Sequence, residues 1–397
     1  KKPGPRRVRG RIGASWLALR PQGGGGYSQP AFDLRLDARN PGMDAAVDVR
    51  SHRTYLVGTS DYEDLGRVYR MSLSLHDGGD TRRVTVGRQI SPSLAAVSLF
   101  DGVLANLSAP RWGAGVFAGS QPDPVRYRLS TDIVESGGYA EWRSRPLSER
   151  RWSVTGGGIA SFDHGNANRN YLFVQSFYAD RKVNAVLSQE VDFYPGWARA
   201  LGEPSVSPSS TFLTARVQAA RTISLDAGYD TRRNVRLYRD RVTPETEFDD
   251  RYRNGVWLGG AYEPGTHLRF SADGRLGSGG DGGNYHTWTT SAEAFRVTPL
   301  QADVRLRASR FIGDLSTEWL EAAGLTFRTL GQTSLGLDAG VRTSQDVLSQ
   351  VETRIVWQSL DLNMGLARNW YLMLSGDHDH GDGLDQVQTY AGLSWLF

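Results

Sequence analysis

The feature that most constrains this chain is an alternation of apolar and polar residues that repeats with a period of two almost from end to end. In residues 301–310, for example, apolar Val304 and Leu306 alternate with charged Arg305 and Arg307. Successive side chains of an extended strand point to opposite faces, so this period predicts strands with one apolar and one polar face. Helical periodicity is hard to find. The same alternation is clear in residues 31–39, 221–232 and 333–342.

Two all-β architectures fit this pattern. A soluble antiparallel sandwich or propeller turns its apolar faces inward, whereas a transmembrane barrel turns them toward lipid. Charges in the middle of many polar faces, and short turns alternating with longer polar loops, favour the barrel. No run approaches the roughly 18 apolar residues of a membrane-spanning helix. The short turns include residues 39–42, 263–266 and 367–369. The expected long loops are residues 22–29, 162–170, 195–210, 232–250, 276–285 and 379–386.

Counting the alternating segments predicts a closed antiparallel transmembrane β-barrel of about 22 strands, within a range of roughly 18 to 24. An even number places both chain ends on the periplasmic side. We expect residues 1–7 to form a basic periplasmic segment and residues 8–397 to form the barrel. Two places leave the count open. Residues 125–130 fit either a strand or a loop, and the apolar face switches between Trp357 and Leu360, where a bulge would explain the change.

The chain ends in a strand with Trp395 and the terminal Phe397 on its apolar face and with Tyr390 and Gly392 on the other. A terminal Phe with an aromatic residue two positions earlier resembles the assembly signal of Gram-negative outer-membrane β-barrel proteins, which include porin-like channels. The resemblance implies a barrel in the bacterial outer membrane, in contact with its lipid, lipopolysaccharide and assembly machinery. The alternative is a hydrophobic edge strand that happens to end the chain, although such a free edge favours aggregation.

A second, shorter resemblance involves two neighbouring segments. Residues 84–89 end in Gly87, Arg88 and Gln89, and residues 100–104 contain an Asp-Gly pair. This combination is similar to a strand end and following strand of some outer-membrane porins and polysaccharide-export channels. The resemblance implies that Arg88 and Gln89 belong to the channel wall near its outer part, and an ordinary strand end is the alternative.

If the apolar faces meet lipid, the opposite faces line the interior of the barrel. The interior then carries both signs of charge in similar numbers, which predicts paired charges, a hydrated pore and mild ion selectivity. For any single residue, a structural ion pair is the alternative role. The predicted lining residues are Arg35, Arg50, Arg70, Arg83, Arg88, Arg216, Arg269, Arg305, Arg307, Arg342, Arg354, Asp33, Asp226, Asp303 and Asp338, with Asp48, Glu190, Asp192, Asp273, Glu293 and Glu352 on the same polar faces.

Composition excludes several functions. The chain has no Cys, which rules out disulfides, thiolate metal sites and haem attachment through a CxxCH motif. Its 46 basic and 43 acidic residues leave a net charge of +3, which argues against nucleic acid as a partner. No GxSxG, HExxH or phosphate-loop pattern appears, so we expect neither enzyme activity nor an organic cofactor.

The densest group of metal-compatible side chains lies near the end of the chain. Asp377, Asp379 and Asp382 offer oxygen ligands among glycines and could hold Ca²⁺, whereas His378 and His380 would suit a borderline metal. No Glu closes the segment at the twelfth position, so it does not match an EF-hand loop. A solvated acidic loop tip is the alternative.

Together these features predict an outer-membrane channel for the diffusion or substrate-selective passage of small polar solutes. Barrels of about 22 strands have a wide lumen and are commonly plugged. Either long loops fold inward, or a lumen-filling protein occupies the hole. The alternative function is therefore a sheath or scaffold around a partner, such as a cytochrome of an electron conduit or a component of a polysaccharide or protein export complex.

Overall fold

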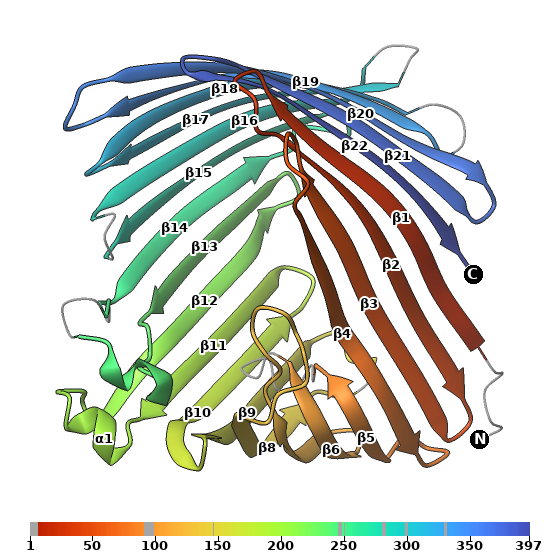
Figure 1. Cartoon of the computed structure of the whole chain (residues 1–397), viewed down its shortest axis with the longest axis vertical. Helices are drawn as coiled ribbons and strands as arrows, with labels where there is room; N and C mark the ends of the chain where they lie inside the picture. Colours follow the sequence, from red (N-terminus) through yellow and green to blue (C-terminus); the bar gives the residue numbers. More distant parts are fainter. Residues whose placement is uncertain are drawn as a thin grey trace.

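The computed structural model describes residues 7–90, 99–145, 147–244, 248–249, 251–279, 283–297, 301–328 and 332–397. The expected N-terminal segment lies outside these residues, except for Arg7. The described chain forms a single antiparallel sheet of 22 strands (Figure 1). The sheet closes on itself because β1 (Arg7–Pro21) pairs with both β2 (Tyr27–Asn40) and β22 (Leu384–Leu396). The prediction of a closed barrel of about 22 strands is confirmed.

Each of the other strands pairs with its neighbours in sequence. The helical elements are the short α1 (Gly196–Arg199) and the 3₁₀ turn η1 (Tyr238–Val242). Neither of these helices of the described chain is long and apolar enough to cross a membrane. The remaining strands are β3 (Met43–Leu56), β4 (Tyr62–His76), β5 (Arg82–Gln89), β6 (Phe100–Ser108), β7 (Trp112–Ser120), β8 (Ile133–Arg143), β9 (Arg151–Asp163), β10 (Asn166–Ala179), β11 (Val183–Phe193), β12 (Val206–Ala220), β13 (Ile223–Arg232), β14 (Arg253–Tyr262), β15 (Leu268–Ser278), β16 (Tyr285–Val297), β17 (Ala302–Gly313), β18 (Ser316–Arg328), β19 (Ser334–Asp346), β20 (Glu352–Ala367) and β21 (Trp370–Gly381).

Strand register explains why the apolar faces lie on the same side of the sheet. Opposed residues in an antiparallel pair share a face, and the outward pairs include Leu337 with Leu360 and Leu372 with Leu393. A slip of one residue would turn every apolar side chain of a strand to the other face. The wall therefore presents apolar side chains outward and polar side chains inward, as in a barrel that spans a membrane.

The end of the chain completes the barrel at the rim that carries both termini, here called the proximal rim. Phe397 and Gly10 exchange two backbone hydrogen bonds of 2.9 and 3.1 Å, so pairing continues past β22. A side chain at Gly10 would clash with the Phe397 ring. Trp395 packs on the same ring at 4.8 Å between centroids, and Trp370 stacks on Trp395 at 6.2 Å. These rings occupy the position of an interfacial aromatic girdle.

The wall bends at β6 to β10, which occupy the lower part of Figure 1. Phe117 of β7 and Ile159 of β9 approach each other over Gly137 of β8, where an added Cβ would lie 2.8 and 3.0 Å from them. Phe173 covers Gly157 in the same way. The missing side chains let inward aromatic groups lie flat on the neighbouring strand and pack together. The resulting buried cluster, here called the corner, contains Phe100, Leu104, Phe117, Ile159, Tyr171 and Phe173.

Turn lengths differ from the expectation at two hairpins. β9 and β10 are joined by His164 and Gly165 alone, and β21 and β22 by Asp382 and Gly383. The long loops expected at residues 162–170 and 379–386 are therefore wrong. Gly165 and Gly383 have φ values of +83° and +71°, which allow tight turns, and the polar residues on either side continue the strands.

Two open points of the sequence interpretation are settled by the structure. Residues 125–130 form part of a loop and not a strand. The bulge expected between Trp357 and Leu360 is wrong, because the register of β19 and β20 continues through this region without a shift. Trp357 instead points inward and covers Gly340, where an added Cβ would lie 2.7 Å from the indole nitrogen.

Candidate channel interior

The inner wall carries charged pairs that reach across an intervening strand. Arg305 of β17 bonds Asp338 of β19 at 3.0 Å, over Gly324 of β18. Arg70 and Arg83 likewise reach Asp37 and Asp44, two strands away, at 3.2 and 2.9 Å. The predicted lining residues on inward-facing positions are Asp33, Arg35, Arg50, Arg70, Arg83, Arg216, Asp226, Arg269, Asp303, Arg305, Arg307, Asp338 and Arg342, together with Asp48, Glu190, Asp192, Asp273 and Glu293. Arg88 is opposite Met71, an exposed residue of the outward face, so the register does not place it on the inner wall.

Arg354 and Glu352 do not lie on the inner wall, which corrects the prediction. Arg354 is opposite Thr343, on the same face as outward Val341 and Leu360. The error follows from the assumed bulge, which would have exchanged the two faces of β20 before Leu360. Because the strand continues without that bulge, its polar end points outward near the distal rim, the rim opposite the chain ends.

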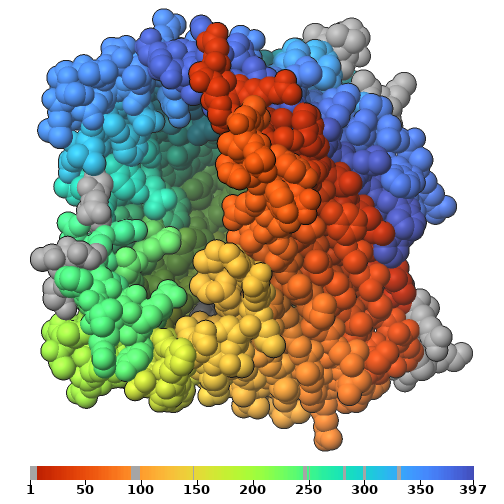
Figure 2. All heavy atoms as spheres, in the orientation of Figure 1, coloured from red at the N-terminus to blue at the C-terminus, as the bar shows by residue number. Residues whose placement is uncertain are grey.

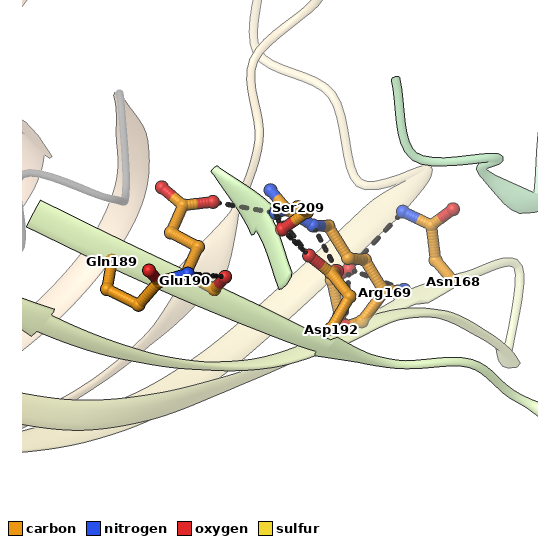
Figure 3. Close-up of polar contacts among 7 residues, drawn as sticks. Asn168, Arg169, Gln189, Glu190, Asp192 and Ser209 are labelled. Carbon is orange, nitrogen blue, oxygen red and sulfur yellow. Dashed lines mark hydrogen bonds and ion pairs between the residues drawn. The ribbon is translucent and has the colours of Figure 1, made fainter. Parts of the chain in front are cut away.

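A buried network around Arg169 joins three strands on the inner wall (Figure 3). The Arg169 guanidinium donates two hydrogen bonds to Asp192, from Nε at 2.6 Å and from Nη2 at 2.8 Å, and a third to Glu190 at 2.7 Å. Asp192 also accepts a short hydrogen bond from Ser209 and is 1% exposed. The guanidinium lies 4.1 Å from the ring centroid of Tyr171, a corner residue. The network therefore connects the corner to β11 and β12.

Two β-bulges put this network together. The register of β9 and β10 shifts between Ala167 and Arg169, which leaves Asn168 as an extra residue. The register of β11 and β12 shifts at Val191, which leaves Ser209 as the extra residue. A bulge re-aims side chains, and here Asn168 and Ser209 flank Arg169 (Figure 3). Arg169 is not among the predicted lining residues, because residues 162–170 are expected to form a loop.

The loops that carry α1 and η1 are fixed to the same place. The indole N–H of Trp197 donates to the carbonyl oxygen of Ala167 at 2.6 Å. The side-chain oxygen of Asn168 accepts a hydrogen bond from the backbone N–H of Tyr238 at 2.8 Å. The Trp197 and Tyr238 rings meet edge to face at 5.5 Å. Ala167 and Asn168 therefore link the wall to the α1 loop and the η1 loop, respectively.

A buried ionic group holds these two loops to each other. The Glu203 carboxylate accepts a hydrogen bond from Arg233 at 2.7 Å and lies 3.7 Å from Arg236, which is 1% exposed. Arg236 also donates to the carbonyl oxygen of Thr243 at 2.9 Å. Burial raises the pKa of Tyr194, at the start of the first loop, to about 12. The described parts of the loops thus have a defined structure over one side of the distal rim.

The Gly-Arg-Gln strand end and the following Asp-Gly pair contact each other. Arg88 donates from Nε to Asp101 at 2.7 Å and is 6% exposed, and Gln89 donates to the carbonyl oxygen of Gly102 at 3.3 Å. Gly87 has a φ of +108°, which a larger residue rarely adopts. The short motif therefore specifies one cross-strand arrangement of β5 and β6.

The loop between β7 and β8 covers Arg88. Its Tyr127 carbonyl oxygen accepts a short hydrogen bond from Arg88, and its Val125 carbonyl oxygen accepts two from Arg67 at 3.0 and 3.2 Å. The Tyr127 ring packs on Tyr69 at 5.3 Å between centroids. This loop is therefore bonded to the wall at β4 and β5.

The opposite side of the interior is more open. Figure 2 shows a hollow between the strands coloured orange and those coloured green to cyan. Arg305 and Arg307 line a cavity of about 390 Å³ together with Asp273, Glu293 and Asp338. Arg307 has no carboxylate within ion-pair distance among the described residues, and the other charges of this cavity surround it. This part of the wall offers both signs of charge to a solute.

The residues proposed for Ca²⁺ do not converge. Asp377 and Asp379 point inward, and Asp379 accepts a hydrogen bond from Gln386 at 2.8 Å. Asp382 lies in the turn, and its carboxylate accepts a hydrogen bond of 2.9 Å from the backbone N–H of Arg354. A calcium site made of these three carboxylates is therefore not formed, because alternate strand positions and a turn place them apart. His378, His380 and Asp385 come together instead, on the outer face.

Comparisons with known proteins identify the fold. No protein-family model matches the chain, and no curated protein matches it. The P pilus usher (PapC) translocation pore is 12% identical, with a TM-score of 0.57 over 98% of this chain and 99% of that chain. OccK7 (OpdD) of Pseudomonas aeruginosa is 11% identical, with a TM-score of 0.50 over 99% of this chain and 98% of that chain. The chain therefore has the fold of outer-membrane channel barrels, as its C-terminal strand predicts.

Proposed function

We propose that this protein is a channel of the bacterial outer membrane through which small polar solutes diffuse. The observation that carries the proposal is the contrast between the two faces of a closed wall. The outer face is apolar, and the inner face carries charged pairs around a hollow. A barrel of this kind is stable in lipid and holds water inside. Its surroundings are outer-membrane lipid and lipopolysaccharide, and it is assembled by the outer-membrane machinery.

The paired charges predict mild ion selectivity. Arg305 is neutralised by Asp338, whereas Arg307 lies in a cavity that also contains Asp273 and Glu293. Charges on a pore wall set selectivity through the field that they create, and neighbouring opposite charges largely cancel that field. Selectivity should therefore change when one sign is removed.

Conductance of the purified chain in a planar bilayer tests the proposal. We expect stable, well-defined conductance steps from the chain alone. Replacing Arg305 and Arg307 together by Gln should shift the reversal potential in a salt gradient toward cations, and replacement by Glu should shift it further. Arg310→Gln is the matched control, because Arg310 lies on the same strand but on the outward face. An unchanged reversal potential in both inward variants would contradict the proposal.

A sheath around a partner protein is the second candidate, and the width of a 22-strand barrel favours it. The solved usher structure is described as a translocation pore, which for this chain would correspond to passage or retention of a polypeptide. In that case the protein should co-purify with a partner in equal amounts after mild detergent extraction. The chain alone should then give large, irregular currents instead of defined steps.

A further inference from the structure

The outer face near the distal rim carries a side-chain cluster that the channel does not use. His378 and His380 stand two residues apart on β21 and therefore share a face. Asp385 of β22 is directly opposite His380. One carboxylate oxygen of Asp385 lies 3.1 Å from Nε2 of His378, and the other lies 3.3 Å from Nδ1 of His380. The three side chains thus converge on one point.

The spacing of the ligand atoms suits a metal ion. The three atoms lie within 4.8 Å of one another. With metal–nitrogen and metal–oxygen bonds of about 2.0–2.2 Å, two ligands of a tetrahedral Zn²⁺ lie roughly 3.3 Å apart. The two carboxylate–imidazole distances of 3.1 and 3.3 Å are close to this value. The two distances involve different oxygens of Asp385, and the three ligand atoms lie within 4.8 Å of one another, so side-chain rotations would draw them together around an ion.

The donor set selects the class of ion. Two imidazole nitrogens and one carboxylate oxygen suit Zn²⁺, Ni²⁺ or Cu²⁺, whereas Ca²⁺ and Mg²⁺ require oxygen ligands. The inward carboxylates of Asp377 and Asp379 are on the other side of the wall and add nothing. Both imidazoles are exposed, and Asp385 is half-buried, so an ion can enter from the water at the membrane surface.

We propose that His378, His380 and Asp385 bind one divalent transition-metal ion of the Zn²⁺ class on the outer wall of the barrel. Water completes the coordination, because the described chain offers three protein ligands here. Both imidazoles bind as neutral groups and the carboxylate binds as an anion. The ion joins β21 to β22 next to their turn at the distal rim.

Zinc titration of the untagged full-length chain in detergent tests this site. Competition with a chromophoric chelator should give one Zn²⁺ per chain in the wild type. His378→Ala, His380→Ala and Asp385→Asn should each lower the Zn²⁺ affinity about tenfold or more. Loss of a residue that only hydrogen-bonds to a metal ligand already costs about 10–100-fold, and these three residues bind the ion directly. His286→Ala is the matched control and should leave binding unchanged, because His286 lies near the same rim of another strand, opposite the apolar Leu276 and Ile312. Ca²⁺ should not compete.

A second readout tests the ligands directly and does not depend on the variants folding. Cu²⁺ bound to the wild type should show coupling to two nitrogen nuclei in its electron paramagnetic resonance spectrum. Heat-modifiable gel migration checks that each variant is folded. The proposal is overturned if the wild type binds no stoichiometric Zn²⁺, if folded His378→Ala and His380→Ala keep wild-type affinity, or if bound Cu²⁺ shows no nitrogen coupling.

Discussion

Asp192→Asn should be among the most destabilising single changes on the inner wall. The Asp192 carboxylate accepts two hydrogen bonds from Arg169 and one from Ser209 while 1% exposed. Asparagine keeps one acceptor oxygen but presents an amide N–H₂ to the guanidinium, so one charged bond is lost and a buried cation is only partly compensated. A charged hydrogen bond contributes about 1.5–3 kcal/mol, and breaking a buried ion pair costs about 3–5 kcal/mol. We therefore expect a loss of about 3–5 kcal/mol in the free energy of unfolding.

Asp338→Asn is the matched control for this change. It also breaks an Arg–Asp pair of the inner wall, but the side chain of Arg305 is 58% exposed. Pairs of this kind contribute about 0–1 kcal/mol, because water screens the charges. Urea unfolding of both variants in lipid, followed by Trp fluorescence, gives the comparison. The reasoning is refuted if Asp192→Asn costs no more than Asp338→Asn.

Three further predictions concern other parts of the barrel. Gly10→Leu should impair insertion into the outer membrane as strongly as deletion of Phe397, because the new side chain would clash with the terminal ring. Gly23→Leu is the control and should insert normally, because nothing lies within 4 Å of Gly23. The amount of each variant in the outer membrane is the measurement. Phe173→Ala should cost about 3–5 kcal/mol in urea unfolding, and a loss below about 1 kcal/mol would contradict the buried corner. Backbone N–H groups of the turn lower the pKa of Asp180. The ionised carboxylate therefore stabilises the fold at neutral pH, and this effect is lost as the pH falls through the lowered pKa. The difference in thermal unfolding temperature between wild type and Asp180→Asn should be seen at pH 7 and disappear in acid.

The sequence predicts the strands well because each one shows its environment locally. An apolar outer face and a polar inner face give the same period-two pattern in every strand, so the barrel, its strand number and most of its inward arginines follow from the pattern. Arg305 and Asp338 were assigned to the same wall on this basis. Their contact was not predictable, since it depends on register across three strands and on the empty space at Gly324.

The sequence does not predict the positions where the alternation of apolar and polar residues no longer matches the outward and inward faces. Asn168 and Ser209 are extra residues in bulges, and bulges shift the faces of a strand without an unambiguous sequence signal. Trp357 is apolar yet inward because it fills space over a glycine of the next strand. His378 and His380 did carry a signal, since two histidines at alternate strand positions share a face. The loop expected at residues 379–386 concealed that the strand continues through His380 and that Asp385 lies opposite it.

The corner has a consequence for the size of the opening. A closed wall of fixed perimeter encloses its largest area when it is round, and the perimeter here is set by 22 strands. At β6 to β10 the inward rings of Phe100, Phe117 and Phe173 are packed against one another and hidden from water. That sector of the cross-section is filled by side chains, so in the proposed channel ions and solutes would pass beside it. Strand number alone therefore overstates the aperture.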